Sequence, residues 1–539
     1  MTSTDTPSTS AAPTARPAAT PTTPALAVRA LRRHPSRVAF EWDGGSMTYA
    51  EAEQTIARMQ AVFASRGLGR GACLALLAGN RAGTWCATTA AQGLGMRTTA
   101  LHPLGSLDDQ RFQLADAGAD ALVVDVAAFG ERGSHLADAV ATTFTLDPAD
   151  YGVDLTAAIA AVGPARHQDL ARPEDVAVIN YTGGTTGRSK GAMRRHSSLG
   201  PSTVAILSDF ELPERPRFLA VAPISHVAGS KVLPTLVRGG TVYLQNGFDP
   251  ERVIHLIDEA RITMTLLVPT MIYTLLDHEA LDRSAAGSGR ALASLELLLY
   301  GASPMAPARL AEGLERIGPV FSQLYGQTEC YPISVLAKED HRTDRPDLYS
   351  SCGSPVASCE VTLLDPDGNE VPTGETGEIC VRSPYVMDEY LDQPELTAQA
   401  FRHGWLHTDD VARQDEEGRL YIVDRAKDMV VSGGFNIYPR EIEDVLTAHQ
   451  AVAMAAVVGA PDDRWGEAVT AVVTLKPGAD ASREELASAL KSLVRDAKGP
   501  AHTPKRVDFV DDLPVTAVGK IDKKAIRAPF WTGHTRQVG

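Results

Sequence analysis

The sequence predicts an α/β protein with a large N-terminal domain of α/β sheets that contains a β subdomain, and a small α+β C-terminal domain. From about Asp175 to Glu329, short apolar stretches repeatedly run into polar turns, which is the rhythm of an α/β sheet. From about Gly353 to Trp405 the chain has many glycines, prolines and short alternating strands, which indicates the β subdomain. New strands and an amphipathic helix follow Arg425, so we predict domains at residues 25–424 and 425–539.

Composition excludes several classes of protein. The 539 residues are 44% apolar and 22% charged, which is ordinary globular usage in a chain long enough for two or more domains. A net charge of -16 argues against nonspecific binding to nucleic acid or to an anionic membrane, because both would repel the protein. The six cysteines follow no metal or disulfide spacing, and no stretch is long and apolar enough to span a bilayer. We therefore expect a soluble protein of the reducing cytoplasm.

Residues 1–24 differ from the rest of the chain. They consist of Thr, Pro, Ala and Ser with almost no bulky apolar residue. Such a segment cannot bury enough apolar surface to order itself, and it lacks the apolar core of a signal peptide. We predict a disordered tail here.

Five apolar strands lead directly into polar motifs. In open α/β sheets ligands bind in the crevice beyond the carboxyl ends of the strands, so these motifs are predicted to converge on one site. The strands and the motifs that follow them are Val176–Ile179 before YTGGTTG, Leu219–Ala222 before PISH, Thr265–Val268 before PT, Leu297–Leu299 before YGASP, and Val320–Leu324 before YGQTE.

Helix boundaries can be predicted between and after these strands. Asp249 followed by Pro250 begins one helix, and Pro307 opens another whose Leu310, Leu314 and Ile317 share a face. In the C-terminal domain, Ser482 with Glu485 three residues later marks a further helix, whose inward residues are Leu486, Leu490, Leu493 and Val494. With the strands Val452–Val458 and Val469–Leu475, this helix gives the domain enough apolar residues for its own core.

The strongest local motif is YTGGTTGRSKG, residues Tyr181–Gly191. Glycines let backbone N–H groups approach a polyphosphate, hydroxyls add donors, and a lysine adds positive charge. The loop is not a Walker A motif, because Ser189 precedes the lysine and Gly191 follows it. We interpret the segment as a phosphate cradle rather than a flexible surface turn, with these ligand residues: Thr182, Gly183, Gly184, Thr185, Thr186 and Lys190.

Seven motifs in a fixed order carry a family resemblance. After YTGGTTGRSKG come PISH, YGASP, LYGQTE, GWLHTDD, DRAKDMVVSGGFNIYPREIE and PVTAVGK. This series resembles the adenylate-forming superfamily, which contains acyl-CoA synthetases, luciferases and the adenylation domains of nonribosomal peptide synthetases. The resemblance covers essentially everything after the tail. The SGGFNIYPREIE run is most similar to acid:CoA ligases, which implies ATP, Mg²⁺ and coenzyme A as cofactors and a small carboxylic acid as substrate.

The resemblance also implies a mechanism. Making an acyl-adenylate brings a carboxylate against the α-phosphate of ATP, and the repulsion between these anions must be offset by a metal ion and cationic donors. Glu329 is the implied magnesium ligand, and the hydroxyl of Thr328 is suited to the α-phosphate. Lys520 resembles the family lysine that bridges the carboxylate and ATP, and His226 resembles the family histidine beside the acyl carboxylate. Outside this pattern, each of these residues would be read as an ordinary polar side chain.

Further residues are assigned by their place in the motifs. Asp410 resembles the acid that holds the ribose hydroxyls, with Arg425 as a second contact. Lys427 falls at the family hinge, about which the small domain swings between two catalytic poses, and Gly433 with Gly434 would then line the CoA channel, although two such glycines also suit a hairpin turn. The residues expected around the adenine are Gly301, Ala302, Ser303, Tyr325 and Gly326.

The sequence departs from the family pattern at four positions. Ser189 stands where proline is common, Glu389 where Gly normally precedes Tyr390, and Ser225 where an aromatic residue precedes the histidine. Asp409 stands where Gly usually precedes the ribose acid, and it adds a negative charge beside the nucleotide. One hypothesis is therefore an enzyme that forms thioesters more readily than adenylates.

Two other functions remain open. A stand-alone adenylation enzyme that loads a carrier protein is the nearest alternative, although such pockets usually place an acid after the PISH position and Val227–Lys231 reads VAGSK. A nonenzymatic nucleotide-binding regulator is a second alternative. Such a protein would be expected to have lost Lys520 or Glu329, and both are present. Luciferase-like oxidation fits less well.

The acid itself is not legible from the sequence. Its pocket should lie beside Val227, Ala228 and Gly229, whose small size is suited to a bulky or long apolar acid, so fatty, aryl and polycyclic acids all remain open. Lys231 can meet a polar group of the acid, or extend to solvent, which we favour. The oligomeric state, including a homodimer, is also left open.

Overall fold

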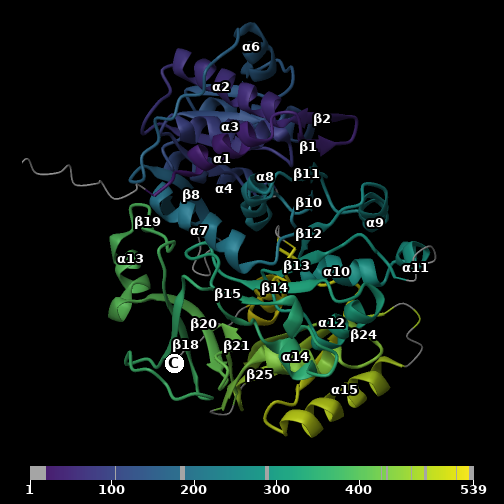
Figure 1. Cartoon of the computed structure of the whole chain (residues 1–539). Helices are drawn as coiled ribbons and strands as arrows, with labels where there is room; N and C mark the ends of the chain where they lie inside the picture. Colours follow the sequence, from purple (N-terminus) through teal and green to yellow (C-terminus); the bar gives the residue numbers. More distant parts are fainter. Residues whose placement is uncertain are drawn as a thin grey trace, which may run out of the picture.

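The computed structural model describes residues 20–532 with gaps at 104, 183–188, 286–289, 426–427, 433–434, 463, 477, 479–481 and 517–518. The chain runs from an N-terminal region of helices packed on sheets, through a middle region, to a β subdomain and the C-terminal domain at the opposite end (Figure 1). The predicted α/β class, with a large N-terminal and a smaller C-terminal domain, is confirmed. In the described part of the chain, no helix is both long and apolar enough to cross a bilayer.

A nine-stranded sheet positions most of the predicted motifs. Its strands β14, β13, β12 and β10 are consecutive neighbours and run parallel. Nearly every residue in them is buried, as expected for strands covered on both faces. The nine strands in sheet order are β16 (Ser354–Pro355), β15 (Ser334–Leu336), β14 (Phe321–Tyr325), β13 (Leu297–Gly301), β12 (Met264–Leu267), β10 (Arg217–Ala220), β11 (Thr241–Leu244), β1 (Val38–Trp42) and β2 (Gly45–Thr48).

The strand before the phosphate motif lies in a second sheet. β8 (Val176–Thr182) pairs antiparallel with β9 (Lys190–Arg195), so the chain returns directly after the motif. This strand therefore belongs to a different sheet from the other four motif strands, which strand-to-motif spacing alone does not reveal. The other strands of this eight-stranded sheet are β19 (Glu389–Tyr390), β4 (Arg97–Ala100), β3 (Cys73–Leu77), β5 (Ala121–Val124), β6 (Thr142–Thr145) and β7 (Val153–Asp154).

Helices of the N-terminal domain cover these sheets. α9 (Pro250–Glu259) is capped by Asp249, and α12 (Pro307–Arg316) buries Leu310 and Leu314, as predicted. α1 begins at Thr23, within the predicted tail, because the Thr22 hydroxyl accepts a hydrogen bond from the Ala25 amide and caps it. Besides α9 and α12, the helices of this domain are α1 (Thr23–Arg33), α2 (Tyr49–Ser65), α3 (Ala82–Gly93), α4 (Leu107–Asp116), α5 (Val126–Ser134), α6 (Leu155–Ala161), α7 (His196–Asp209), α8 (Val232–Val237), α10 (Pro269–Leu276), α11 (Ala280–Ala285) and α13 (Pro394–Ala400).

The β subdomain and the C-terminal domain follow. The β subdomain is a four-stranded antiparallel sheet of β17 (Glu360–Leu364), β18 (Thr376–Arg382), β20 (Leu406–Gln414) and β21 (Leu420–Arg425). The C-terminal domain contains β22 (Val430–Ser432), β23 (Phe435–Ile437), α14 (Pro439–Thr447), β24 (Val452–Asp462), β25 (Gly466–Leu475), α15 (Arg483–Lys498), β26 (Arg506–Phe509) and α16 (Lys523–Arg527).

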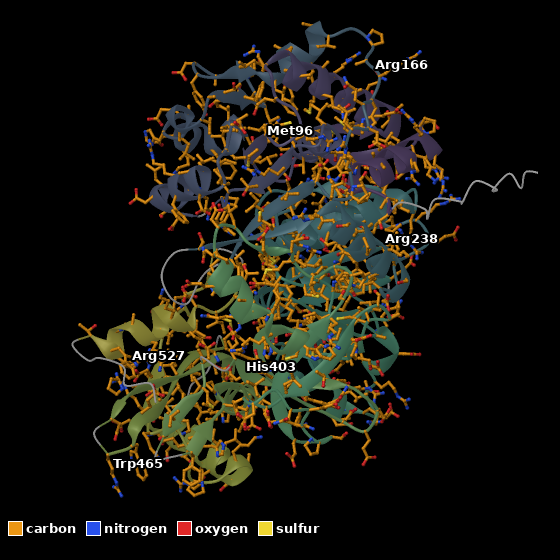
Figure 2. The ribbon with its side chains drawn as sticks, turned by 90° about the vertical axis from the view of Figure 1, so that its left-hand side faces the viewer. Met96, Arg166, Arg238, His403, Trp465 and Arg527 are labelled. Atoms are coloured by element: carbon orange, nitrogen blue, oxygen red, sulfur yellow. The ribbon has the colours of Figure 1, made fainter. Side chains whose placement is uncertain are left out.

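The C-terminal domain has its own apolar core. Ser482 caps α15 by accepting from the Glu485 amide, and Leu486, Leu490 and Val494 pack into that core as predicted. In Figure 2, Trp465 and Arg527 lie in this smaller part of the molecule, whereas the buried Met96 lies inside the N-terminal domain.

One close backbone contact fixes the end of β13, and it can be tested. A Cβ on Gly301 would lie 2.2 Å from the Leu324 carbonyl oxygen of the paired strand β14. We expect Gly301→Ala to push the two strand ends apart and to raise the KM for ATP by about tenfold or more, because small displacements of positioning groups are costly. The measurement is steady-state AMP production. Gly163→Ala is the control, since its Cβ would meet nothing within 4 Å, and equal effects of the two changes would contradict the prediction.

Candidate active site

Polar turns gather where the parallel strands β10, β12, β13 and β14 end. His226 follows β10, Thr270 follows β12, the turn at Ala302 follows β13, and Gly326 follows β14. Because these strands are neighbours in the sheet, the four turns lie side by side. The predicted convergence of these motifs is therefore found in the structure.

The phosphate motif is described only at its edges. Thr182 ends β8 and Lys190 begins β9, while Gly183, Gly184, Thr185 and Thr186 lie outside the described residues. The ammonium of Lys190 lies 5.3 Å from the centre of the Tyr390 ring. This contact brings the lysine of the motif close to the residue that holds Glu329, as shown below.

Asp410 is the centre of a hydrogen-bond network. Its Oδ2 accepts from the Tyr325 hydroxyl and from Gln327 Nε2, each at 2.7 Å, and its Oδ1 lies 3.3 Å from Arg425 Nε. The Asp410 amide donates to Thr408 Oγ1 at 3.2 Å. These hydrogen bonds fix the orientation of the carboxylate, and Asp410 is only 5% exposed. Our sequence reasoning missed Gln327, although its place inside YGQTE could have suggested a role.

Lys520 reaches this network from the C-terminal domain. Burial and the positive charge of Arg425 lower its pKa from 10.5 to about 8, and Asp410 opposes this shift. Its loop is a small hairpin in which the Thr516 amide donates to the Lys520 carbonyl, and Thr270 Oγ1 of α10 donates to the Gly519 carbonyl at 2.9 Å. The loop is therefore docked on the ends of the parallel strands, with the lysine close to Arg425 and Asp410.

His226 lies beside the same lysine. Its Nδ1 is 2.8 Å from Ser225 Oγ, and its ring packs edge-on against His102 at 4.8 Å. Burial, His102 and then Lys520 lower the pKa of His226 to about 4. The imidazole is therefore neutral at pH 7, which suits a residue that positions the substrate. His102 carried no signal in the sequence.

Glu329 is held by the β19 segment. Its Oε1 accepts from the Tyr390 hydroxyl at 2.7 Å, and burial followed by the Glu329 charge raises the pKa of Tyr390, so the phenol stays a donor. The donor set fits magnesium, which uses one or two carboxylates together with phosphate and water oxygens. The half-buried carboxylate of Glu329 keeps Oε2 for such an ion, because Tyr390 is its one hydrogen-bond partner within the described ranges. Thr328 precedes it and is likewise half-buried.

Comparisons with known proteins agree with this geometry. Residues 27–391 match the family model of AMP-binding enzymes, and residues 441–520 match the AMP-binding enzyme C-terminal domain. The chain belongs to the AMP-binding enzyme family.

Similar proteins support the same assignment. A medium/long-chain-fatty-acid--CoA ligase, FadD8 of Mycobacterium tuberculosis, is 43% identical over 95% of this chain and 91% of its own. A feruloyl-CoA synthase of Amycolatopsis is 35% identical over 93% and 98%. Among solved structures, the amide bond synthetase McbA of Marinactinospora thermotolerans superimposes with a TM-score of 0.86, at 34% identity over 94% of this chain and all of that one. The prediction of an AMP-forming acid:CoA ligase is confirmed.

Asp409 of this AMP-binding enzyme occupies a left-handed turn. Its φ is +60°, which explains why glycine suits the position and why aspartate, which tolerates this region, can replace it. Its side chain is exposed, and its charge helps to raise the pKa of Tyr390 after burial and Glu329. The charge therefore acts toward the Glu329 side of the site, and the hypothesis of weakened adenylation remains a prediction.

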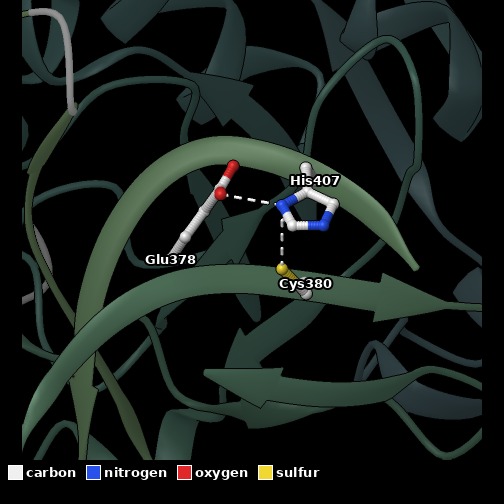
Figure 3. Close-up of side chains that lie close together, drawn as sticks. All are labelled: Glu378, Cys380 and His407. Atoms are coloured by element: carbon white, nitrogen blue, oxygen red, sulfur yellow. Dashed lines mark hydrogen bonds and ion pairs between the residues drawn. The ribbon is translucent and has the colours of Figure 1, made fainter. Parts of the chain in front are cut away.

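Glu378 braces the turn at Asp409. Its Oε1 accepts from the Asp409 amide at 2.9 Å, while its Oε2 lies 2.7 Å from His407 Nδ1, which is also 3.4 Å from Cys380 Sγ (Figure 3). These three side chains offer metal-type donors, but the Arg402 guanidinium lies 3.4 Å from Glu378 Oε2 and already supplies the positive charge. We interpret these side chains as a structural support that fixes the backbone of residues 407–409, which lead to Asp410.

A cavity lies where the acyl pocket was predicted, and Ser225 and His226 are among the residues that line it. The cavity has a volume of about 280 Å³, and Gly229 lines it, whereas Val227 and Ala228 do not. Gly229 was predicted to make room for the acid, which stays a prediction, and the structure gives a second reason for a glycine here, because a Cβ would lie 1.8 Å from the Ile224 carbonyl oxygen. The glycine serves a tight backbone turn. The predicted exposure of Lys231 is wrong, since the side chain is 0% exposed.

Three residues assigned to the second step lie outside the described residues. These are Lys427 at the hinge and Gly433 and Gly434 at the CoA channel. Their described neighbours Val431 and Phe435 are 46% and 60% exposed.

The lowered pKa of Lys520 predicts a pH dependence. The ammonium is present below about pH 8 and is lost above it, so kcat/KM for the acid should fall as the pH rises through about 8. In Lys520→Arg the cation persists at all accessible pH values, so this falling limb should disappear even if the rate is lower. AMP production measured from about pH 6 to pH 10 tests this, and an unchanged limb in the arginine variant would assign it to another group.

The charge of Asp409 predicts a gain of function. Asp409→Asn removes the charge and keeps a residue that tolerates φ near +60°, so the KM for ATP should fall about two- to fivefold, the range of an exposed charge interaction. Asp409→Gly should behave alike. ATP–pyrophosphate exchange reports the first step alone, and wild-type exchange as fast as overall CoA ligation would refute the hypothesis of impaired adenylation.

Proposed function

We propose that this enzyme activates a fatty or aryl carboxylic acid in two steps, with Mg²⁺-ATP and then CoA as co-substrates. Lys520 beside Asp410, Arg425 and His226 is the observation that carries this proposal. A lysine beside these groups would supply positive charge between the expected ribose site and the expected acyl carboxylate. It is the charge that adenylation requires, because the two reacting groups are anions.

In the first step the acid carboxylate attacks the α-phosphate of ATP and pyrophosphate leaves. Lys520 and Thr328 hold the reacting oxygens, Glu329 holds Mg²⁺, and Asp410 with Arg425 holds the ribose. The Gly301–Ser303 turn and Tyr325 enclose the adenine, while residues 182–186 and Lys190 cradle the phosphates. When bound, the metal ion neutralises phosphate charge.

In the second step the CoA thiol attacks the acyl carbonyl and AMP leaves. We infer that the C-terminal domain, residues 425–539, swings about Lys427 and withdraws Lys520 from the site. Gly433 and Gly434 then line the thiol channel. The exposed Val431 and Phe435 beside them favour this movement, because it gives large apolar side chains a surface to cover.

The relatives suggest the class of acid. FadD8 is named for medium- and long-chain fatty acids and the Amycolatopsis enzyme for ferulic acid, so both aliphatic and aryl acids are candidates. The enzyme is proposed to act in the cytoplasm, which suits cysteines that are all buried and unpaired. A homodimer remains open to measurement.

Separate assays of the two steps test the role of Lys520. Lys520→Ala should lower AMP production from acid and ATP by about a thousandfold, as for other groups that stabilise transition-state charge. Thioester formation from a supplied acyl-adenylate and CoA should change less than about threefold, because the lysine is withdrawn in that step. AMP production by Lys520→Ala at the wild-type rate would refute the proposed mechanism. Equal loss in both assays would instead indicate a structural role for the lysine.

A further inference from the structure

The cavity beside His226 has a polar wall. Hydroxyl and amide side chains from α3, β4, β8 and α7 line it, where an apolar pocket was expected. They include Thr84, Thr88, Thr98, Asn180 and Ser202. Polar groups in a cavity favour ligands that can form hydrogen bonds with them.

A buried lysine stands behind this wall. Lys231 Nζ donates to Ser230 Oγ at 2.8 Å and to the Tyr331 hydroxyl at 2.5 Å, and it lies 4.9 Å from the centre of the Phe210 ring. Within the described part of the chain, no carboxylate forms an ion pair with it, and burial lowers its pKa well below the usual value. Ser230 and Tyr331 both line the cavity.

Lys231 and Ser230 hold the Tyr331 hydroxyl in the wall of the cavity. Ser230 Oγ accepts a hydrogen bond from Lys231 and donates one to the Val227 carbonyl oxygen at 2.7 Å. Tyr331 also accepts from Lys231, and burial raises its pKa, so the phenol keeps its proton. Its O–H is therefore a hydrogen-bond donor in the cavity wall, with Ser230 beside it.

A second buried cation lines the same cavity. Arg194 is 5% exposed and donates from one terminal nitrogen to the Tyr385 carbonyl at 3.2 Å. Its Nε has no hydrogen-bond partner within the described residues. Both sides of this wall therefore present N–H or O–H groups, and neither presents a carboxylate.

We propose that Tyr331, oriented by Lys231, donates a hydrogen bond to an oxygen atom on the tail of the acid. The substrates are then acids with a hydroxyl, ether or keto oxygen away from the reacting carboxylate, in preference to plain alkanoic acids. This inference rests on the function proposed above and specifies its substrate class. Such a site discriminates because only an acid that carries the oxygen gains this hydrogen bond.

Matched acids provide the test. AMP production is measured for cinnamic against 4-hydroxycinnamic acid and for octanoic against 7-oxo-octanoic acid. The wild type should prefer the oxygen-bearing member of at least one pair by about tenfold in kcat/KM, the scale of one or two net hydrogen bonds. Tyr331→Phe should lower kcat/KM for that member alone and bring the ratio close to one. Tyr349→Phe is the control, because it removes a phenol that donates to the Arg342 carbonyl elsewhere and should leave the ratio unchanged.

Each outcome decides the matter. A wild-type ratio near one, or an equal loss for both members in Tyr331→Phe, overturns the inference while the proposed function stands. A preference for suberic over octanoic acid that survives Tyr331→Phe also overturns it, since recognition then belongs to Arg194. No AMP from any of these acids would overturn the proposed function and the inference with it. Lys231→Met should reproduce the tyrosine variant, and if it fails to fold, Tyr331→Phe decides alone.

Discussion

The approach of a cation from the C-terminal domain to the ends of the parallel strands is the interaction on which the site depends. The lysine at position 520 gains its place through backbone contacts, since Thr270 Oγ1 holds the Gly519 carbonyl and the hairpin closes on itself. Once there, it faces Asp410 and Arg425 in a partly desolvated setting, which lowers its pKa. The parallel strands bring the turns together, but without this docking Lys520 does not reach Asp410, Arg425 and His226.

Strand-and-turn patterns in the sequence were sufficient to predict most of the fold. A buried parallel strand reads as an apolar run, and its polar turn marks the ligand edge, so β10, β12, β13 and β14 could be placed. The pattern does not say which sheet a strand joins, and β8 pairs with β9 in the second sheet. Tyr325 and Arg425 were assigned by their place in motifs that resemble a family, and the structure brings both into contact with Asp410. Glu378, Tyr390 and His102 were missed, because tertiary packing alone brings them to the site.

Small residues in a motif have more than one physical cause. Gly229 and Gly301 both lie where a ligand is expected, yet in each case the nearest atom to an added Cβ is a backbone carbonyl oxygen of the protein, at 1.8 and 2.2 Å. The glycines allow segments of the chain to approach one another, and only the three-dimensional structure separates this cause from room for substrate. Lys231 shows the same limit, because a lysine after a turn is usually solvated and here the chain buries it between Phe210 and Tyr331.

The two proposed steps make opposite demands on charge near His226. During adenylation a cation beside the carboxylate is required, and Lys520 supplies it while helping to hold the pKa of His226 near 4. In thioester formation the thiol loses a proton. A neighbouring ammonium disfavours a positive charge on the His226 imidazole, so it would hinder the imidazole from accepting that proton. Withdrawal of the lysine removes one of the three causes that depress the histidine pKa, although burial and His102 remain. A domain movement that exchanges Lys520 for the CoA channel therefore alters both the access of the thiol and the basicity of the residue beside the acyl carbonyl.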